Sequence, residues 1–370
     1  MSRILTLYRE YGQSIWLDYI DRNLLLRDGL KTLISEGLRG VTSNPTIFHK
    51  AIGGSTDYDE PIRDLLQANH QIDDGTLYEW LVVQDAQMAA DILEPVYVSS
   101  EGLDGYVSLE VSPYIAHDSA LTIKEARHLW RAVNRPNLMI KVPATEAGLP
   151  ATEQLLAEGI NVNNTLLFSV ERYKAVAETY LRGVARAAEP AKIASVASFF
   201  ISRVDSKVDA ALDEIGGSEA RALKGRIAIA NARMAYQHFI DTVASEPFQA
   251  QEQRGARPQR PLWASTSTKN PDYSDVMYVE QLIGPDTVNT LPPATLDAFE
   301  AHGELRATLD VGLKAAQRDL ETLGKLGIDL WALSDELEQE GIRKFMDSYD
   351  QALNTLDEKR FKVAQRYASE

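Results

Sequence analysis

Short apolar or β-branched runs, each bounded by turn residues, occur eight times along the chain. Such runs are typical of buried strands, and they lie at 14–20, 40–43, 106–111, 138–142, 160–168, 194–201, 261–265 and 287–291. Stretches with the helical spacing of apolar residues separate them, at 24–36, 77–93, 123–133, 151–157, 170–187, 220–243, 273–283 and 293–301. Strands that alternate with helices predict parallel βα units with right-handed crossovers, and eight units match a (β/α)8 barrel.

A doubly wound sheet is the alternative, but it calls for a glycine-rich turn after the first strand. The turn found there is Asp21-Arg22-Asn23, so a dinucleotide site is disfavoured. After the eighth unit, helical patterns continue over 309–326 and 330–368. The second pattern is long, charged and amphipathic, with Gly341 as a candidate interruption.

We therefore expect an α/β protein, a (β/α)8 TIM barrel with additional N- and C-terminal helices. Residues 1–305 would form the catalytic barrel, and 306–370 a helical extension packed on it within a single domain. A partner-binding role is the alternative for this extension. The segment 246–260, rich in Gln, Arg and Pro, is expected to be a solvated connection.

Composition narrows the classes of function. The chain of 370 residues has a formal net charge of −16, which argues against nucleic acid as its main partner. It has no cysteine, so disulfides, thiolate catalysis and cysteine-based metal sites are excluded. Neither a signal peptide nor an apolar run long enough to span a membrane is evident. These features fit a cytoplasmic protein and leave open whether it is a monomer or a homodimer.

Lys141 stands inside the fourth predicted strand, in an otherwise apolar setting. Lysine is rarely buried unless it is paired or used, and lost hydration favours the neutral amine, which attacks carbonyl groups to form a Schiff base. The alternative is a strand-end lysine whose amine reaches solvent or a carboxylate.

Other polar residues also fall where predicted strands end, which is where barrel enzymes hold their chemistry. Taken singly, each can be explained as a surface carboxylate, a helix N-cap, a satisfied core polar group or, for Arg203, a rim charge. Together they would cost free energy in a barrel that had no use for them. The residues concerned are Asp18, Thr42, Asn44, Glu110, Asn163, Thr165, Ser198, Arg203 and Lys269.

Three segments in this order resemble transaldolase, specifically its longer bacterial form. They are 40–46 (Gly-Val-Thr-Ser-Asn-Pro-Thr), 140–145 (Ile-Lys-Val-Pro-Ala-Thr) and 160–169 (Ile-Asn-Val-Asn-Asn-Thr-Leu-Leu-Phe-Ser), and the resemblance covers nearly the whole chain. It implies a barrel without cofactor or metal that moves a three-carbon dihydroxyacetone unit between sugar phosphates.

The resemblance also implies catalytic roles. Lys141 would form the Schiff base with the ketose, and Asp18 would take the proton from the C4 hydroxyl. Glu110 and Thr165 would hold a water that shuttles protons.

Substrate binding would fall to a second group of residues. The hydroxyls of the three-carbon unit would be oriented by Asn44 and Asn163, with support from Thr42 and Ser198. Phe200 would lie in the site, and Arg203 would bind the phosphate. Shorter relatives carry a second arginine where this chain has Lys269, so the phosphate role of Lys269 stays open.

Three other functions are alternatives to transfer of the dihydroxyacetone unit. A fructose 6-phosphate aldolase would use the same lysine but release free dihydroxyacetone, and such relatives tend to carry Gln and Tyr where this chain has Glu110 and Phe200. A metal-dependent sugar isomerase would need clustered histidine and carboxylate ligands, and the six histidines here fall in predicted helices or loops. A non-catalytic sugar-phosphate-binding barrel would be expected to lack Lys141, Asp18 or Glu110, and all three are present.

Overall fold

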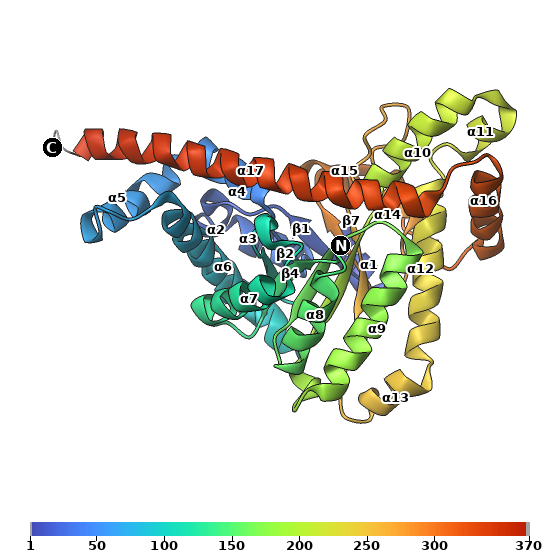
Figure 1. The fold of residues 1–370 in the computed structure, drawn as a ribbon, viewed down its shortest axis with the longest axis horizontal. Coiled ribbons are helices and arrows are strands. Elements are labelled where there is room, and N and C mark those ends of the chain that lie inside the picture. The colour runs from blue at the N-terminus through green and yellow to red at the C-terminus, as the bar shows by residue number, and fades with distance from the viewer. Residues whose placement is uncertain (1, 368–370) are drawn as a thin grey trace.

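The computed structural model describes residues 2–367, so residues 1 and 368–370, at the ends of the two expected segments, lie outside the described range. Eight parallel strands close into a barrel in chain order (Figure 1). They are β1 (Gln13–Asp18), β2 (Gly40–Thr42), β3 (Tyr106–Glu110), β4 (Leu138–Pro143), β5 (Val162–Leu167), β6 (Ser195–Phe200), β7 (Arg260–Ala264) and β8 (Thr287–Leu291). All eight predicted strands are confirmed, with ends shifted by at most two residues.

Helices follow the strands and surround the barrel, and none within residues 2–367 is long and apolar enough to cross a bilayer. They are α1 (Arg3–Tyr11), α2 (Arg22–Leu26), α3 (Gly29–Glu36), α4 (Pro45–Gly54), α5 (Asp59–Ala68), α6 (Asp74–Ser99), α7 (Ser119–Val133), α8 (Gly148–Ala157), α9 (Val170–Arg186), α10 (Ser202–Ile215), α11 (Gly217–Leu223), α12 (Ile227–Val243), α13 (Glu246–Glu252), α14 (Met277–Gln281), α15 (Pro293–His302), α16 (Leu313–Lys325) and α17 (Leu330–Tyr367).

Some helix predictions were wrong in detail. The pattern 24–36 is split into α2 and α3 at Asp28, which has a φ of 59°, and 220–243 is split near Gly225, which has a φ of 69°. Segment 246–260 is not a simple connection, because Ser245 accepts a hydrogen bond from Phe248 N and so caps α13. Gly341 does not interrupt α17, which is continuous.

Strand register places the predicted polar residues next to one another. Asp18 on β1 lies opposite Thr42 on β2, Glu110 on β3 lies opposite Lys141 on β4, and Lys141 lies opposite Asn163 on β5. Because neighbouring strands are about 4.8 Å apart, this register alone brings the side chains to one end of the barrel.

The other end of the barrel is closed by a buried polar network. Arg260 Nη2 lies 2.9 Å from Asp104 Oδ1, Ser14 Oγ donates to Asp104 Oδ2 at 2.8 Å, and Arg260 Nη1 donates to Ser14 Oγ at 3.1 Å. These groups satisfy one another, so we assign them to the stability of the barrel.

The last helix, α17, runs across the carboxyl end of the barrel (Figure 1). It packs most extensively on α4 and also contacts α5, α6, α10 and β5. Ion pairs anchor its first half: Glu338 lies 3.6 Å from Arg172 of α9, and Lys207 of α10 pairs with Glu336 and Glu340. Further along, Ser348 Oγ lies 2.8 Å from Thr46 Oγ1 of α4.

The buried carboxyl of Glu338 predicts a pH-dependent stability, because its burial outweighs the ion pair with Arg172. Burial, ahead of the opposing charge of Arg172, raises the pKa of Glu338 to about 7. A carboxyl with a higher pKa in the folded state contributes stability at low pH that is lost as the pH rises through that value. The unfolding free energy of Glu338→Gln minus that of wild type should therefore rise by about 1–2 kcal/mol when the pH is raised from about 5 to about 8. This is less than the full pKa shift would give, because solvent screens part of the interaction.

Urea unfolding at the two pH values measures this difference. Glu336→Gln is the matched control, because it makes the same change at an exposed side chain of the same helix. If the difference in unfolding free energy between Glu338→Gln and wild type does not change with pH, the raised pKa of Glu338 is contradicted.

Candidate active site

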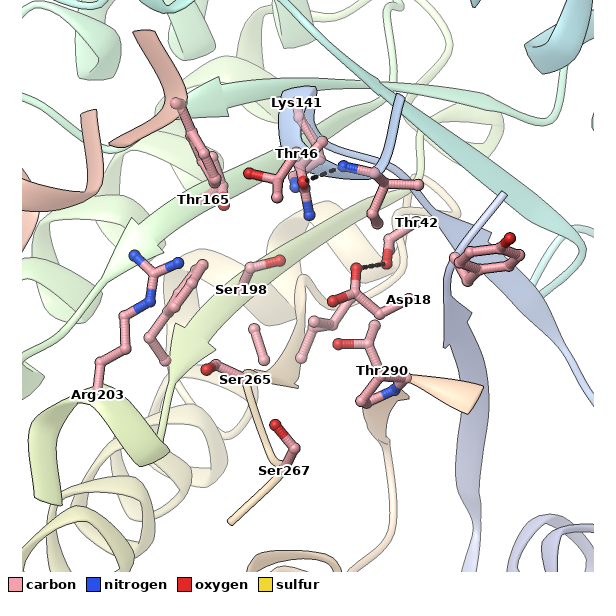
Figure 2. A pocket seen from close by; sticks show the side chains of 18 of the residues that line it. Asp18, Thr42, Thr46, Lys141, Thr165, Ser198, Arg203, Ser265, Ser267 and Thr290 are labelled. Atoms are coloured by element: carbon pink, nitrogen blue, oxygen red, sulfur yellow. Dashed lines mark hydrogen bonds between the residues drawn. The ribbon is translucent and has the colours of Figure 1, made fainter. Parts of the chain in front are cut away.

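A cavity of about 530 Å³ opens at the carboxyl ends of the strands, beneath α17 (Figure 2). Among the residues proposed from sequence, nine line it, from seven different elements or the loops that follow them: Asp18, Thr42, Asn44, Lys141, Thr165, Ser198, Phe200, Arg203 and Lys269. Glu110 and Asn163 are not among its lining residues: Glu110 lines a second cavity together with Asn44, and Asn163 is fully buried.

Lys141 lies deep in this cavity and is 5% exposed. Its Nζ donates a hydrogen bond of 3.0 Å to the carbonyl oxygen of Ser43, at the end of β2. The same atom lies 3.4 Å from Glu110 Oε2 on the neighbouring strand. The amine is thus held in place by one carbonyl and one carboxylate, while its side chain still reaches the cavity.

Glu110 and Thr165 flank Lys141 with unused hydrogen-bonding capacity. Within the described residues, the buried oxygens Oε1 and Oε2 of Glu110 and Oγ1 of Thr165 accept or donate no hydrogen bond. Burial raises the pKa of Glu110, against the lowering effect of Lys141. Buried polar atoms of this kind are costly unless a ligand or water pairs with them, which fits a site for a small polar molecule.

Thr165 owes its position to an irregularity in β5. The register between β5 and β6 shifts between Asn164 and Leu167, and Leu166 has a φ of 62°. A bulge changes the direction in which side chains point. Here Thr165 lines the cavity, while Leu166 lies under Gly341 of α17.

Asp18 is fixed by its neighbour. Thr42 Oγ1 donates a hydrogen bond of 2.8 Å to Asp18 Oδ1, and Figure 2 shows this pair on the far side of the cavity from Arg203. The second carboxylate oxygen of Asp18 is therefore left to act on a molecule in the cavity.

Three amide and hydroxyl side chains differ in what they can reach. Asn44 Oδ1 caps α4 by accepting from Ile47 N at 3.1 Å, and the residue lines the cavity. Asn163 is fully buried: its Nδ2 donates to Ser108 Oγ at 3.1 Å, and its Oδ1 accepts from Ser198 Oγ at 2.7 Å. Asn163 thus orients Ser198, which lines the cavity.

Positive charge gathers on the outer side of the cavity. Arg203, at the start of α10, lies over the ring of Phe200 at 5.1 Å from its centroid. Lys269, in the loop after β7, donates to Ser267 Oγ at 2.6 Å. Burial, and then the charges of Lys344 and Arg203, lower the pKa of Lys269. This part of the cavity is suited to an anion.

Several lining residues were missed by sequence analysis. They are Tyr19, Thr46, Ile47, Lys50, Leu262, Ala264, Ser265, Ser267, Thr290, Pro292, Pro293, Ala294, Lys344 and Phe345. For most of them the available signal was proximity to a strand end. Lys344 and Phe345 gave no such signal, because they lie some fifty residues beyond the last strand.

Among residues 2–367, no three His, Cys, Asp or Glu side chains converge in a way that could hold a metal ion. None of the six histidines lines the cavity. The chemistry available is therefore that of one amine between two carboxylates in different surroundings. Asp18 is hydrogen-bonded at the cavity wall, whereas Glu110 is buried beside the amine, an arrangement that separates acid and base roles.

Comparison with known proteins agrees with this geometry. The profile of the transaldolase/fructose-6-phosphate aldolase family matches residues 15–356. Transaldolase 2 of Nostoc sp. (strain PCC 7120) is 48% identical over 95% of this chain and 96% of its own length. The transaldolases of Frankia alni and Mycolicibacterium smegmatis are 46% and 45% identical, over 96% and 93% of this chain and 97% and 94% of their own lengths. The chain has the barrel and the buried lysine, and it is similar to these transaldolases over nearly its full length. It therefore belongs to the transaldolase family.

Proposed function

We propose that the chain is a transferase that moves a dihydroxyacetone unit between sugar phosphates through a Schiff base on Lys141. The net reaction is sedoheptulose 7-phosphate plus glyceraldehyde 3-phosphate to erythrose 4-phosphate plus fructose 6-phosphate. The observation that carries the proposal is the buried amine of Lys141 at the base of a cavity with a cationic outer side. This reaction belongs to the non-oxidative pentose phosphate pathway, and we place the protein in the cytoplasm.

The first step joins Lys141 to the substrate. Neutral Nζ attacks the C2 carbonyl of the ketose, and loss of water from the carbinolamine gives a protonated imine. Protons must reach the oxygen that leaves, and Glu110 is placed for this task beside Nζ. Its raised pKa favours a carboxyl that can donate. A water held between Glu110 and Thr165 would use the unpaired oxygens of both side chains.

The second step breaks the bond between C3 and C4. Asp18 removes the proton of the C4 hydroxyl, the electrons of the bond flow into the imine, and the aldehyde phosphate leaves. Thr42 keeps Asp18 oriented by its hydrogen bond. The three-carbon unit stays on Lys141 as an enamine, held by Asn44 and Ser198, with Asn163 orienting Ser198.

In the third step the aldehyde of a second sugar phosphate enters and the sequence runs in reverse. The enamine carbon attacks the aldehyde, Asp18 returns the proton to the new hydroxyl, and water releases the product from Lys141. Arg203 binds the phosphate of each sugar in turn, with Lys269 as a further point charge.

Lys141 should carry the covalent intermediate. Incubation with fructose 6-phosphate followed by borohydride reduction should leave a three-carbon adduct on Lys141, located by mass spectrometry of the digested protein. Lys141→Met should form no adduct at this position, whereas the control Lys124→Met, at an exposed lysine of α7, should react like wild type. Folded wild-type protein without an adduct after several ketose phosphates would refute the mechanism.

Asp18 should act after the Schiff base has formed. Asp18→Asn cannot accept the C4 proton, so reduction in the presence of fructose 6-phosphate should trap the intact six-carbon phosphate on Lys141. Turnover should fall by at least about 100-fold, the usual scale for a lost general base. Asp297→Asn, at an exposed carboxylate of α15, is the control. A three-carbon adduct on Asp18→Asn at the wild-type rate would assign the base elsewhere.

The matching family profile also covers fructose 6-phosphate aldolases, which makes release of free dihydroxyacetone the second candidate. The two are separated by supplying fructose 6-phosphate with and without erythrose 4-phosphate. A transferase should form sedoheptulose 7-phosphate and release little dihydroxyacetone. Acceptor-independent release of dihydroxyacetone at a comparable rate would favour the aldolase.

A further inference from the structure

Four cationic side chains from four separate parts of the chain line the active-site cavity. Lys50 comes from α4, Arg203 from α10, Lys269 from the loop after β7, and Lys344 from α17. Sequence analysis had identified Arg203 and Lys269, whereas Lys50 and Lys344 were brought to the cavity by the fold. Their convergence is unexpected in a chain whose net charge is −16.

Carboxylates act on these cations without pairing with them: burial lowers the pKa of Arg203, and the charges of Asp18, Glu110 and Glu340 oppose that effect. Within the part of the chain that the structure describes, no ion pair joins any of the four to an acidic residue. Glu336 and Glu340, on the same helix as Lys344, pair with Lys207 instead. Asp18 is the one acidic residue among those that line the cavity, and its Oδ1 already accepts from Thr42.

The path of α17 explains how Lys344 reaches this position. A Cβ on Gly341 would lie 2.9 Å from Leu166 Cδ2 and 3.5 Å from Arg203 Nη1, so the helix backbone comes very close to both residues. Lys344 and Phe345 follow at three and four residues, on the same face of the helix. The contact at Gly341 thus sets Lys344 beside Arg203 at the opening of the cavity.

Like charges this close repel one another unless an anion lies between them. The neighbouring charge of Arg203 is the largest cause that lowers the pKa of Lys344, followed by burial and by Lys50. The same set of cations lowers the pKa of Lys269 after burial. A bound dianion would remove this repulsion and gain charge-assisted hydrogen bonds.

We propose that Lys344 of α17, together with Lys50 of α4, binds the phosphate group of the sugar substrate jointly with Arg203 and Lys269. The inference rests on the proposed function for its choice of ligand, a phosphate monoester. It makes α17 a wall of the substrate site rather than an appended layer. The phosphate connects the barrel to this helix, while Lys141, deep in the cavity, meets the carbonyl end of the same molecule.

The test uses inorganic phosphate as the probe and the full chain throughout. Isothermal titration calorimetry would compare wild type with Lys344→Met, which removes the charge but keeps an unbranched side chain. Lys344→Arg is the conservative variant that keeps the charge. Arg343→Met is the matched control, because it removes the same charge from the adjacent, exposed position of α17 that does not line the cavity.

We expect the Kd for phosphate to rise about tenfold to twentyfold in Lys344→Met, the lower part of the range for a hydrogen bond between charged groups. Lys344→Arg should stay within about threefold of wild type, and Arg343→Met within about twofold. For fructose 6-phosphate, Lys344→Met should raise KM by a similar factor and change kcat by less than about threefold, because the contact is remote from the reacting bond.

If Lys344→Met and Arg343→Met weaken phosphate binding equally, the proposal is overturned, because the effect then comes from the overall charge of the helix. Unchanged phosphate binding in Lys344→Met would overturn it as well. The phosphate titration does not depend on turnover. A chain that bound phosphate through Lys344 but formed no adduct on Lys141 would refute the proposed function and retain this site.

Discussion

The site depends on keeping a primary amine inside the barrel without surrounding it by water. Lys141 is almost fully buried, and its amine is held by the Ser43 carbonyl and by Glu110. A buried charge without such partners would cost several kcal/mol. Parallel pairing of β2, β3 and β4 sets these partners next to one another, so the barrel itself supplies the surroundings that the amine needs. Glu110 in turn is tolerated because Lys141 opposes the effect of its burial.

The need of buried polar groups for partners is met differently at the two ends of the barrel. At the amino ends of the strands, Arg260, Asp104 and Ser14 satisfy one another and leave nothing for a ligand. At the carboxyl ends, Thr165 Oγ1 and both carboxylate oxygens of Glu110 make no hydrogen bond within the described residues, although Glu110 Oε2 lies 3.4 Å from Lys141 Nζ. Within residues 2–367 other buried atoms also lack a hydrogen bond, such as Gln13 Oε1 and Gln259 Oε1 at the amino end. What distinguishes Glu110 and Thr165 is that theirs lie around Lys141, where a substrate could satisfy atoms that otherwise reduce stability.

Sequence predicted the barrel and nine of the residues that line the cavity because both are encoded locally. Eight short apolar runs gave eight strands, and polar residues at their ends gave Asp18, Lys141 and Thr165 at the cavity. Helical spacing in α17 predicted a helix packed on the barrel but could not show which residues it would contact. The glycine read as a candidate interruption, Gly341, is instead where the helix touches the barrel. Likewise, nothing local distinguished Asn163, which supports Ser198 from behind, from residues that line the cavity.

The cavity's charge has to be understood against that of the whole protein. A surface with a net charge of −16 repels a phosphate dianion at long range, but at physiological salt this field decays over about 8 Å. The lysines and arginine at the opening act within that distance and therefore decide whether an anion enters. Because they come from α4, α10, α17 and the loop after β7, their arrangement exists only when α17 is docked. If the proposed phosphate site is correct, the contacts of α17 with Arg172 and Lys207 hold Lys344 in place without touching the substrate.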